Sequence, residues 1–345
     1  MIDIARPTRL AIIGAGAWGI NHVRVVANEP RCELVSVVDR DPTARERART
    51  LAPRANISED VDRVFGDPEI EAVIIATPAK THVGLARAAI AAHKHVLIEK
   101  PLALSERDAR VIAAEARADR AFMVGHLMAF HPAVTRLREL LRSGELGRLH
   151  YVHSTRANLG KIRKDETALW SFGPHELSML DYLLERSPVS VAARGHCVVQ
   201  PSIEDVVFVT LRYPEGEMAH MHLSWLHPRK ERALTLVCSR RMVEFDDVSP
   251  EKLRIYDKGY NRPQSFTQFG EYLTLRDGDV YIPQLSMHEP LRLQLEHFLH
   301  CVRTGEAPRT DLRSALRITA TLDAAQRSLG LDGVPVSLTN HDHTI

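Results

Sequence analysis

Cysteine is scarce in this sequence of 345 residues, and the four cysteines form no recognisable pattern. They lie far apart, and no two of them are separated by only two residues. Zinc knuckles use closely spaced cysteine pairs, and small secreted domains use a dense set of disulfides. The spacing therefore argues against both kinds of site, and we expect a protein of the reducing cytoplasm.

An excess of one charge and long hydrophobic runs are also missing. The chain has 45 Lys and Arg against 44 Asp and Glu, which leaves a formal net charge of +1. Such a chain has no strong field to attract phosphate backbones or anionic lipids. No segment approaches the roughly 18 apolar residues that a membrane span needs. Nucleic acids and membranes are therefore not expected as partners.

The first part of the chain alternates short apolar runs with longer stretches of helical periodicity. The apolar runs are Leu10–Gly14, Leu34–Asp39, Ala72–Thr77 and His95–Lys100. Apolar, β-branched runs of this kind are typical of parallel strands covered on both faces. We therefore predict an α/β fold whose N-terminal domain, residues 1–127, is a doubly wound parallel sheet of the Rossmann type.

After this domain the predicted strands become longer, and apolar residues alternate with polar residues along them. Predicted strands are Leu149–Arg156, Val189–Val199, Val206–Tyr213, Met218–Trp225, Ala233–Cys238, Met242–Phe245 and Lys252–Tyr256. Short turns between such strands favour an antiparallel sheet. Residues 128–345 are therefore predicted to form an α+β domain with a large, mostly antiparallel open sheet. Its late helices, near Pro290–Arg303 and Leu312–Ser328, should pack back near the first domain.

A glycine-rich turn, G-A-G-A-W-G, follows the first predicted strand and opens a helix. Gly14 would permit the tight turn, Gly16 would let a pyrophosphate approach, and Gly19 would let the helix pack on the strand. An acidic residue, Asp39, ends the second strand, where a carboxylate binds ribose hydroxyls and repels a 2′-phosphate. Dinucleotide binding is predicted, with NAD preferred. Arg40 leaves NADP open, because a guanidinium there could pair with a phosphate or stack on adenine.

Three motifs together resemble the Gfo/Idh/MocA oxidoreductase family. They are the glycine turn, A-T-P-A-K-T-H at Ala76–His82 and E-K-P-L at Glu99–Leu102. The resemblance implies hydride transfer between a nicotinamide and a sugar, cyclitol or nucleotide-sugar, in a homodimer or homotetramer. The cofactor-binding residues predicted from the glycine turn, from the acidic residue after the second strand and from the resemblance are Gly14, Gly16, Ala17, Trp18, Gly19, Asp39, Arg40, Thr77, Pro78, His82, Glu99 and Lys100.

The resemblance also implies two catalytic residues. Lys100, the lysine of E-K-P, would polarise the substrate oxygen, and His175 would move the proton. The chain departs from the family pattern here, because Ser171 and Ser178 stand where carboxylates are expected around the histidine. Simpler interpretations are a solvated lysine and a histidine that only packs or caps at a helix start.

Substrate contacts are predicted on both sides of the domain boundary. The candidates are Lys100, His126, Asn158, Lys161, Arg163, Trp170 and His175. Amide and cationic side chains of this kind hold sugar hydroxyls or diphosphates, although a solvated basic loop would look the same. No metal is predicted, because the close histidine pairs lack an accompanying ligand set.

Two other functions remain open at this stage. One is an enzyme that recycles a tightly held NAD while it cleaves a glycoside, with no net production of NADH. The other is a non-catalytic nucleotide-sensing regulator, which the serines at 171 and 178 would permit. Retention of both Lys100 and His175 favours the dehydrogenase.

Overall fold

The computed structural model describes residues 6–164, 166–261 and 274–338. The chain divides into two compact units. Unit 1 contains residues 1–130 and 288–319, and unit 2 contains residues 131–287 and 320–345. In the described ranges no helix is long and apolar enough to cross a membrane.

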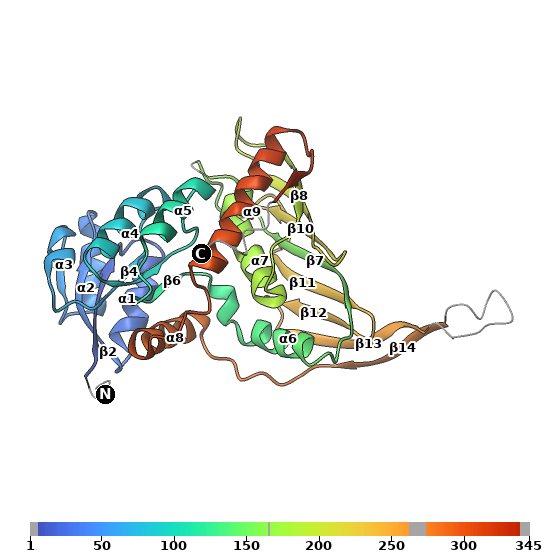
Figure 1. The fold of residues 1–345 in the computed structure, drawn as a ribbon, viewed down its shortest axis with the longest axis horizontal. Coiled ribbons are helices and arrows are strands. Elements are labelled where there is room, and N and C mark those ends of the chain that lie inside the picture. Colours follow the sequence, from blue (N-terminus) through green and yellow to red (C-terminus); the bar gives the residue numbers. More distant parts are fainter. Residues whose placement is uncertain (1–5, 165, 262–273, 339–345) are drawn as a thin grey trace. The chain divides into compact units, whose positions relative to one another are not determined.

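Unit 1 is built around a parallel sheet (Figure 1). Among the described residues, its six strands have the order β3-β2-β1-β4-β5-β6. They are β1 (Thr8–Ile13), β2 (Cys32–Val38), β3 (Asn56–Ser58), β4 (Ala72–Ile75), β5 (His95–Ile98) and β6 (Phe122–Val124). This is the Rossmann order, which reverses direction between β1 and β4, and it confirms the predicted doubly wound sheet.

Helices cover both faces of this sheet. They are α1 (Gly19–Ala27), α2 (Pro42–Leu51), α3 (Asp62–Gly66), α4 (His82–Ala91) and α5 (Glu106–Glu115), with the short 3-10 helices η1 (Ala79–Thr81) and η2 (Leu127–Phe130). Parallel strands are joined by right-handed crossovers. Because the chain passes from β1 to β2 in one direction across the sheet and from β4 to β5 in the other, α1 and α4 lie on opposite faces. The face under α3, α4 and α5 buries a continuous apolar cluster that includes Ile13, Val73 and Ile112. α8 (Pro290–Thr304) and the first part of α9 (Leu312–Gly330) also belong to unit 1.

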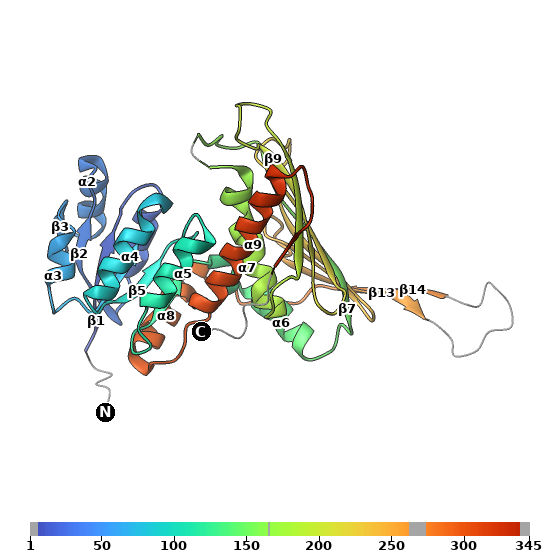
Figure 2. The ribbon, with the colours of Figure 1, turned by 45° about the horizontal axis from the view of Figure 1, so that its top comes forward.

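Unit 2 contains one large sheet, seen nearly edge-on in Figure 2. In the part of the chain that the structure describes, nine strands follow the order β14-β13-β12-β11-β7-β10-β9-β8-β15. They are β7 (Leu149–Ala157), β8 (Ser190–His196), β9 (Val206–Arg212), β10 (Met218–Ser224), β11 (Glu231–Cys238), β12 (Met242–Asp246), β13 (Leu253–Asn261), β14 (Thr274–Tyr281) and β15 (Val336–Ser337). The pairs are antiparallel except β7 with β10, which confirms the mostly antiparallel prediction.

One face of the unit 2 sheet carries its helices. They are α6 (Pro132–Arg142), α7 (Ala168–Leu184) and the second part of α9. Strand β10 shows why the faces differ, because Ala219, Met221 and Leu223 are buried while Met218 and His220 on the other face are not. This alternation is the period of a strand with only one face in the core.

Candidate functional site

The glycine turn between β1 and α1 has the geometry that its spacing predicts. Gly14 has a φ of +97°, and a Cβ there would lie 2.7 Å from the carbonyl oxygen of Ala76. A Cβ on Gly19 would lie 2.1 Å from the carbonyl oxygen of Gly14. A Cβ on Gly16, in contrast, would lie within 4 Å of no atom of the described residues. Two glycines are therefore fixed by close packing, and the third leaves an open side on the turn.

The helix that follows begins without a side-chain cap. Trp18 is the N-cap residue of α1, and in the part of the chain that the structure describes no side chain caps this helix. The helix dipole attracts an anion to such a start, and the N–H groups of Ile20 and Asn21 already donate to the carbonyl oxygens of Gly16 and Trp18. Ala17 and Trp18 are exposed beside them. The open side of Gly16 and the dipole of α1 are features that suit an anion.

Asp39 lies directly after β2 and connects two backbone segments. Its Oδ2 accepts a hydrogen bond from the N–H of Ala15 at 2.6 Å, and its Oδ1 accepts one from the N–H of Asp41 at 2.8 Å. A carboxylate has about four acceptor sites, so about two stay available for a ligand. Arg40 is exposed at the next position. The carboxylate is therefore fixed beside the turn and can still accept hydroxyl protons.

The loop after β4 is held in place by His82. Its Nδ1 lies 2.8 Å from the carbonyl oxygen of Pro101, and its Nε2 lies 2.9 Å from that of Thr77. The ring is buried, and this burial lowers its pKa. Pro78 is exposed on the same loop. The imidazole of His82 thus joins the loop after β4 to the loop after β5, and any effect on a cofactor passes through these loops.

Lys100 and His126 follow the neighbouring strands β5 and β6. Lys100 is half-buried in the loop after β5. His126 is only 2% exposed, and neither of its ring nitrogens has a hydrogen-bond partner among the described residues. Burial, reinforced by the charge of Lys100, lowers the pKa of His126 to about 4 although Glu99 opposes the change. The imidazole is therefore neutral near pH 7 and offers one donor and one acceptor next to the lysine.

The contacts of Glu99 were missed by the sequence analysis. Its Oε1 accepts hydrogen bonds from Trp18 Nε1 and His22 Nε2, both at 2.8 Å. His22 was not among the predicted site residues. The only local signal was its spacing, since His22 follows Trp18 by four positions and therefore lies on the same side of a helix.

In unit 2, helix α7 carries His175. The helix starts at the N-cap Thr167, whose hydroxyl accepts a hydrogen bond from the N–H of Trp170. His175 is half-buried near the middle of α7, directly after Pro174. The hydroxyl of Ser178 donates to the carbonyl oxygen of His175 at 2.8 Å. One of the two serines at the expected carboxylate positions thus bonds the backbone of the histidine.

Glu176, the neighbour of His175, faces the sheet. Arg156 Nε donates to its Oε1, and the hydroxyl of Ser154 donates to its Oε2. The side chains of Glu176 and Arg156 are 1% and 6% exposed. A buried ion pair therefore ties α7 to β7 and fixes the helix that presents His175.

The remaining predicted substrate residues differ in their surroundings. Lys161 and Arg163 are exposed, and Arg163 Nε lies 3.3 Å from a carboxylate oxygen of Glu166. Asn158 is half-buried, and its backbone N–H donates to Ser224. Trp170 is buried, and its Nε1 donates to Gln326 Oε1 at 3.0 Å. The exposed Lys161 can thus reach an anion, whereas Arg163 and the indole N–H of Trp170 already have partners.

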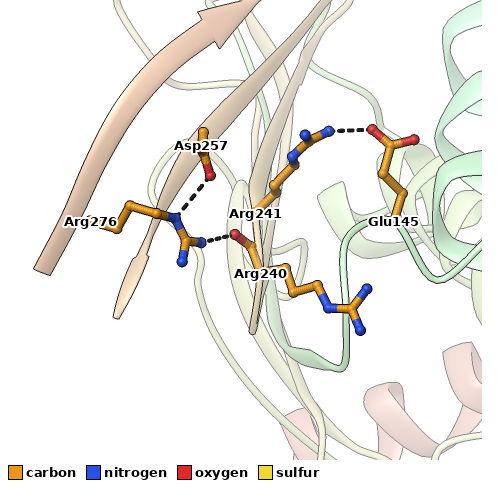
Figure 3. A pocket seen from close by; sticks show the side chains of 5 residues that line it. All are labelled: Glu145, Arg240, Arg241, Asp257 and Arg276. Carbon is orange, nitrogen blue, oxygen red and sulfur yellow. Dashed lines mark hydrogen bonds and ion pairs between the residues drawn. The ribbon is translucent and has the colours of Figure 1, made fainter. Parts of the chain in front are cut away.

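A hollow of about 410 Å³ lies elsewhere in unit 2 (Figure 3). It is lined by Glu145, Arg240, Arg241, Asp257 and Arg276. Arg241 pairs with Glu145, and Arg276 pairs with Asp257 at 2.9 Å. None of the predicted site residues lines this hollow. Among the described residues, no group of three or more His, Cys, Asp or Glu is arranged to hold a metal ion.

Comparisons with known proteins agree with this geometry. Residues 8–126 match the model of an oxidoreductase family with an NAD-binding Rossmann fold, and residues 134–244 match the Gfo/Idh/MocA C-terminal domain. An inositol 2-dehydrogenase of Acidothermus cellulolyticus is 34% identical over 64% of this chain and 67% of its own length. A scyllo-inositol 2-dehydrogenase (NAD(+)) of Bacillus subtilis is 28% identical over 96% of both chains.

A solved structure covers nearly the whole chain. It is described as an oxidoreductase from Magnetospirillum magnetotacticum MS-1, with 32% sequence identity and a TM-score of 0.79, over 92% of this chain and 99% of that one. Two family models, the similarity to these proteins and the glycine turn lead to one conclusion. The chain belongs to the Gfo/Idh/MocA family of oxidoreductases and carries an NAD-binding Rossmann domain.

Proposed function

We propose that this NAD-binding oxidoreductase transfers hydride between nicotinamide and a hydroxyl or keto carbon of a cyclitol, sugar or nucleotide-sugar. The inositol dehydrogenases among its relatives favour a cyclitol as the first substrate to test. One observation carries the proposal: the carboxyl ends of β1, β2 and β5 present the glycine turn, Asp39 and Lys100 at one edge of the sheet. Ligands of open α/β sheets bind at this edge, where the strand order reverses.

The residues at this edge fit a dinucleotide. The open side of Gly16 and the uncapped start of α1 suit a pyrophosphate, and the free acceptor sites of Asp39 suit two ribose hydroxyls. A 2′-phosphate would face the same carboxylate, so we propose a preference for NAD over NADP. When bound, NAD supplies the hydride acceptor or donor. Ala17, Trp18, Arg40, Thr77, Pro78 and His82 complete the proposed cofactor surroundings.

Lys100 and His175 are assigned the proton chemistry. A carbon gives up hydride only as its hydroxyl loses a proton, so a cation that hydrogen-bonds the oxygen stabilises the developing negative charge. We assign this role to Lys100 and the removal of the proton to His175, because imidazole is the commonest general base in proteins. His126, Asn158, Lys161, Arg163 and Trp170 are the proposed substrate contacts.

Absorbance at 340 nm tests the proposal. The protein, freed of bound nucleotide, is mixed with NAD or NADP and with inositols, free sugars and nucleotide-sugars. We expect NADH formation with one of these classes. Lys100→Ala should lower kcat by roughly 10² to 10⁴ with little change in NAD affinity, because it removes an interaction of the transition state. The exposed Lys230 supplies the matched control, Lys230→Ala.

His175→Ala should also lower kcat, whereas His300→Ala on the surface of α8 should not. Normal turnover in Lys100→Ala would remove this lysine from the mechanism. Tightly held NAD with no absorbance change, together with release of free sugar from a glycoside, would instead indicate internal recycling of the cofactor. Tightly held NAD with no product of either kind would indicate a sensor.

We also propose that the chain self-associates through the exposed face of the unit 2 sheet. Phe208 stacks on His222 with ring centroids 4.7 Å apart, and His220 stacks on His153 at 5.9 Å. Phe208 is 45% exposed, so the rings form a surface patch of aromatic character. Sedimentation of the wild type and Phe208→Asp tests the proposal, with an oligomer expected only for the wild type. A monomeric wild type would contradict it.

A further inference from the structure

The carboxylate of Glu99 connects two segments that lie far apart in the sequence. Oε1 accepts hydrogen bonds from Trp18 Nε1 and His22 Nε2, both at 2.8 Å. Oε2 accepts one from the backbone N–H of Lys100 at 3.2 Å. One side chain thus links the N-cap and first turns of α1, just after the glycine turn, to the backbone of the proposed catalytic lysine.

Glu99 keeps its negative charge despite burial. Its side chain is 12% exposed, and that of His22 is 2% exposed. Burial alone would raise the pKa of Glu99, but the hydrogen bond and charge of His22, with the hydrogen bond of Trp18 and the charge of Lys100, hold it below its usual range. An ionised carboxylate only accepts hydrogen bonds, so Trp18 and His22 both donate to it.

The end of the neighbouring strand leaves room for this carboxylate. A Cβ on Gly125 would lie 3.0 Å from both Cδ and Oε1 of Glu99. Gly125 is itself fixed, because its N–H donates to the carbonyl oxygen of Ile98 at 2.7 Å. The carboxylate of Glu99 therefore contacts three segments, which are the loop after β5, the loop after β6 and the start of α1.

Trp18 is partly exposed although its indole N–H donates to the largely buried carboxylate of Glu99. Its side chain lies at the N-cap of α1, beside the proposed phosphate site, and is 44% exposed. The indole N–H nevertheless bonds a carboxylate that is largely buried. The donor that holds Glu99 therefore lies directly beside the proposed phosphate site.

We propose that Glu99 is a positioning residue that couples cofactor binding at the glycine turn to the placement of Lys100, with Trp18 and His22 as its anchors. The inference rests on the proposed function, which assigns Lys100 its catalytic role. Glu99 does not touch the reacting atoms in this scheme. It fixes the backbone from which the lysine side chain extends, and a misplacement of about 1 Å at a reacting group can cost about 100-fold in rate.

Glu99→Gln is the first test. An amide has one acceptor and one donor group, so it cannot accept from Trp18, His22 and the N–H of Lys100 together. We expect kcat to fall by up to about 100-fold while the dissociation constant for NAD changes little. Glu115→Gln, which alters an exposed carboxylate on α5, is the matched control and should leave both quantities unchanged.

A double-mutant cycle separates positioning through Lys100 from other effects. If Glu99 acts through the lysine, Glu99→Gln should lower kcat no further in a Lys100→Ala background. Equal losses in both backgrounds would overturn the proposal. Normal turnover in Lys100→Ala alone would instead remove this lysine from the proposed mechanism, and a wild type that forms no NADH would contradict the proposed function, so the failures are distinguishable.

Fluorescence of the cofactor-free protein gives a readout independent of turnover. The difference in emission between the wild type and Trp18→Phe isolates Trp18 from the other two tryptophans. We expect Glu99→Gln to shift this difference spectrum and to reduce its response to added NAD. An unchanged spectrum and response would contradict the coupling. If Glu99→Gln fails to fold, Trp18→Phe replaces it in the cycle, because it keeps a ring and removes only the donor.

Discussion

Asp39→Ala perturbs the proposed ribose contact most directly. The wild-type carboxylate bonds the N–H groups of Ala15 and Asp41, which fixes its direction and leaves about two acceptor sites for the ribose hydroxyls. A hydrogen bond to a charged group contributes about 1.5 kcal/mol at the low end of its range, the value we use because Asp39 is only half-buried. Two such bonds amount to about 3 kcal/mol, or roughly a 150-fold loss of NAD affinity.

The loss should be smaller for NADP. A 2′-phosphate gains when the carboxylate is removed, so the preference for NAD should shrink or reverse. Asp39→Asn keeps one acceptor and removes the charge, and we expect an intermediate effect.

Asp41→Ala is the matched control. Asp41 carries the same charge two positions away, and its side chain caps α2 through the N–H of Thr43 at 2.9 Å. Its loss should cost about 1 kcal/mol of stability with little change in NAD affinity. Titration calorimetry with NAD and NADP measures both ligands on each variant. If Asp39→Ala folds normally and binds NAD and NADP with wild-type affinities, the assignment of the ribose contact is wrong.

Two further predictions concern stability. Gly19→Ala should destabilise the fold strongly, because its Cβ would overlap the carbonyl oxygen of Gly14. Gly16→Ala should unfold at the wild-type temperature and weaken only NAD binding. Equal melting temperatures for the two variants would contradict the geometry of the turn. The pKa of about 4 for His126 lies below its ordinary value of about 6.5, so the unfolded chain takes up a proton first as the pH falls. The free energy of unfolding should therefore drop between pH 6.5 and 4, by about 3 kcal/mol from this residue, and urea titrations should show a shallower dependence in His126→Asn.

The local patterns of the sequence determined the framework of the nucleotide domain. The four strands predicted between Leu10 and Lys100 agree with β1, β2, β4 and β5 to within two residues at each end, because buried parallel strands require apolar runs that few other structures share. The short strand β3 lies in the same range and was not predicted. The packing roles of Gly14 and Gly19 were predicted from their spacing, because close packing at both positions and a positive φ at Gly14 exclude a larger residue. The placement of Lys100 at the carboxyl edge of the sheet follows from the same strand order.

Elements without a distinctive local pattern were not predicted. Strand β14, with the sequence T-L-R-D-G-D-V-Y, is almost wholly exposed, so no buried face imposes an apolar alternation. Helix α7 contains Gly173 and Pro174, residues that usually interrupt helices, and its packing on β7, β9 and β10 outweighs them. Burial of an apolar face stabilises α7, whereas backbone pairing with β13 forms β14, and only the folded chain supplies either.

Only the tertiary structure decided which polar groups meet inside the protein. Trp18 and Glu99 are 81 positions apart, and Arg156 and Glu176 join a strand to a helix. Each of these charges is stable in its place because partners from distant segments replace the water that burial removes. A sequence indicates the charged residue, but its partners depend on the packing of strands and helices, so the contacts of Glu99 appeared only in the folded chain.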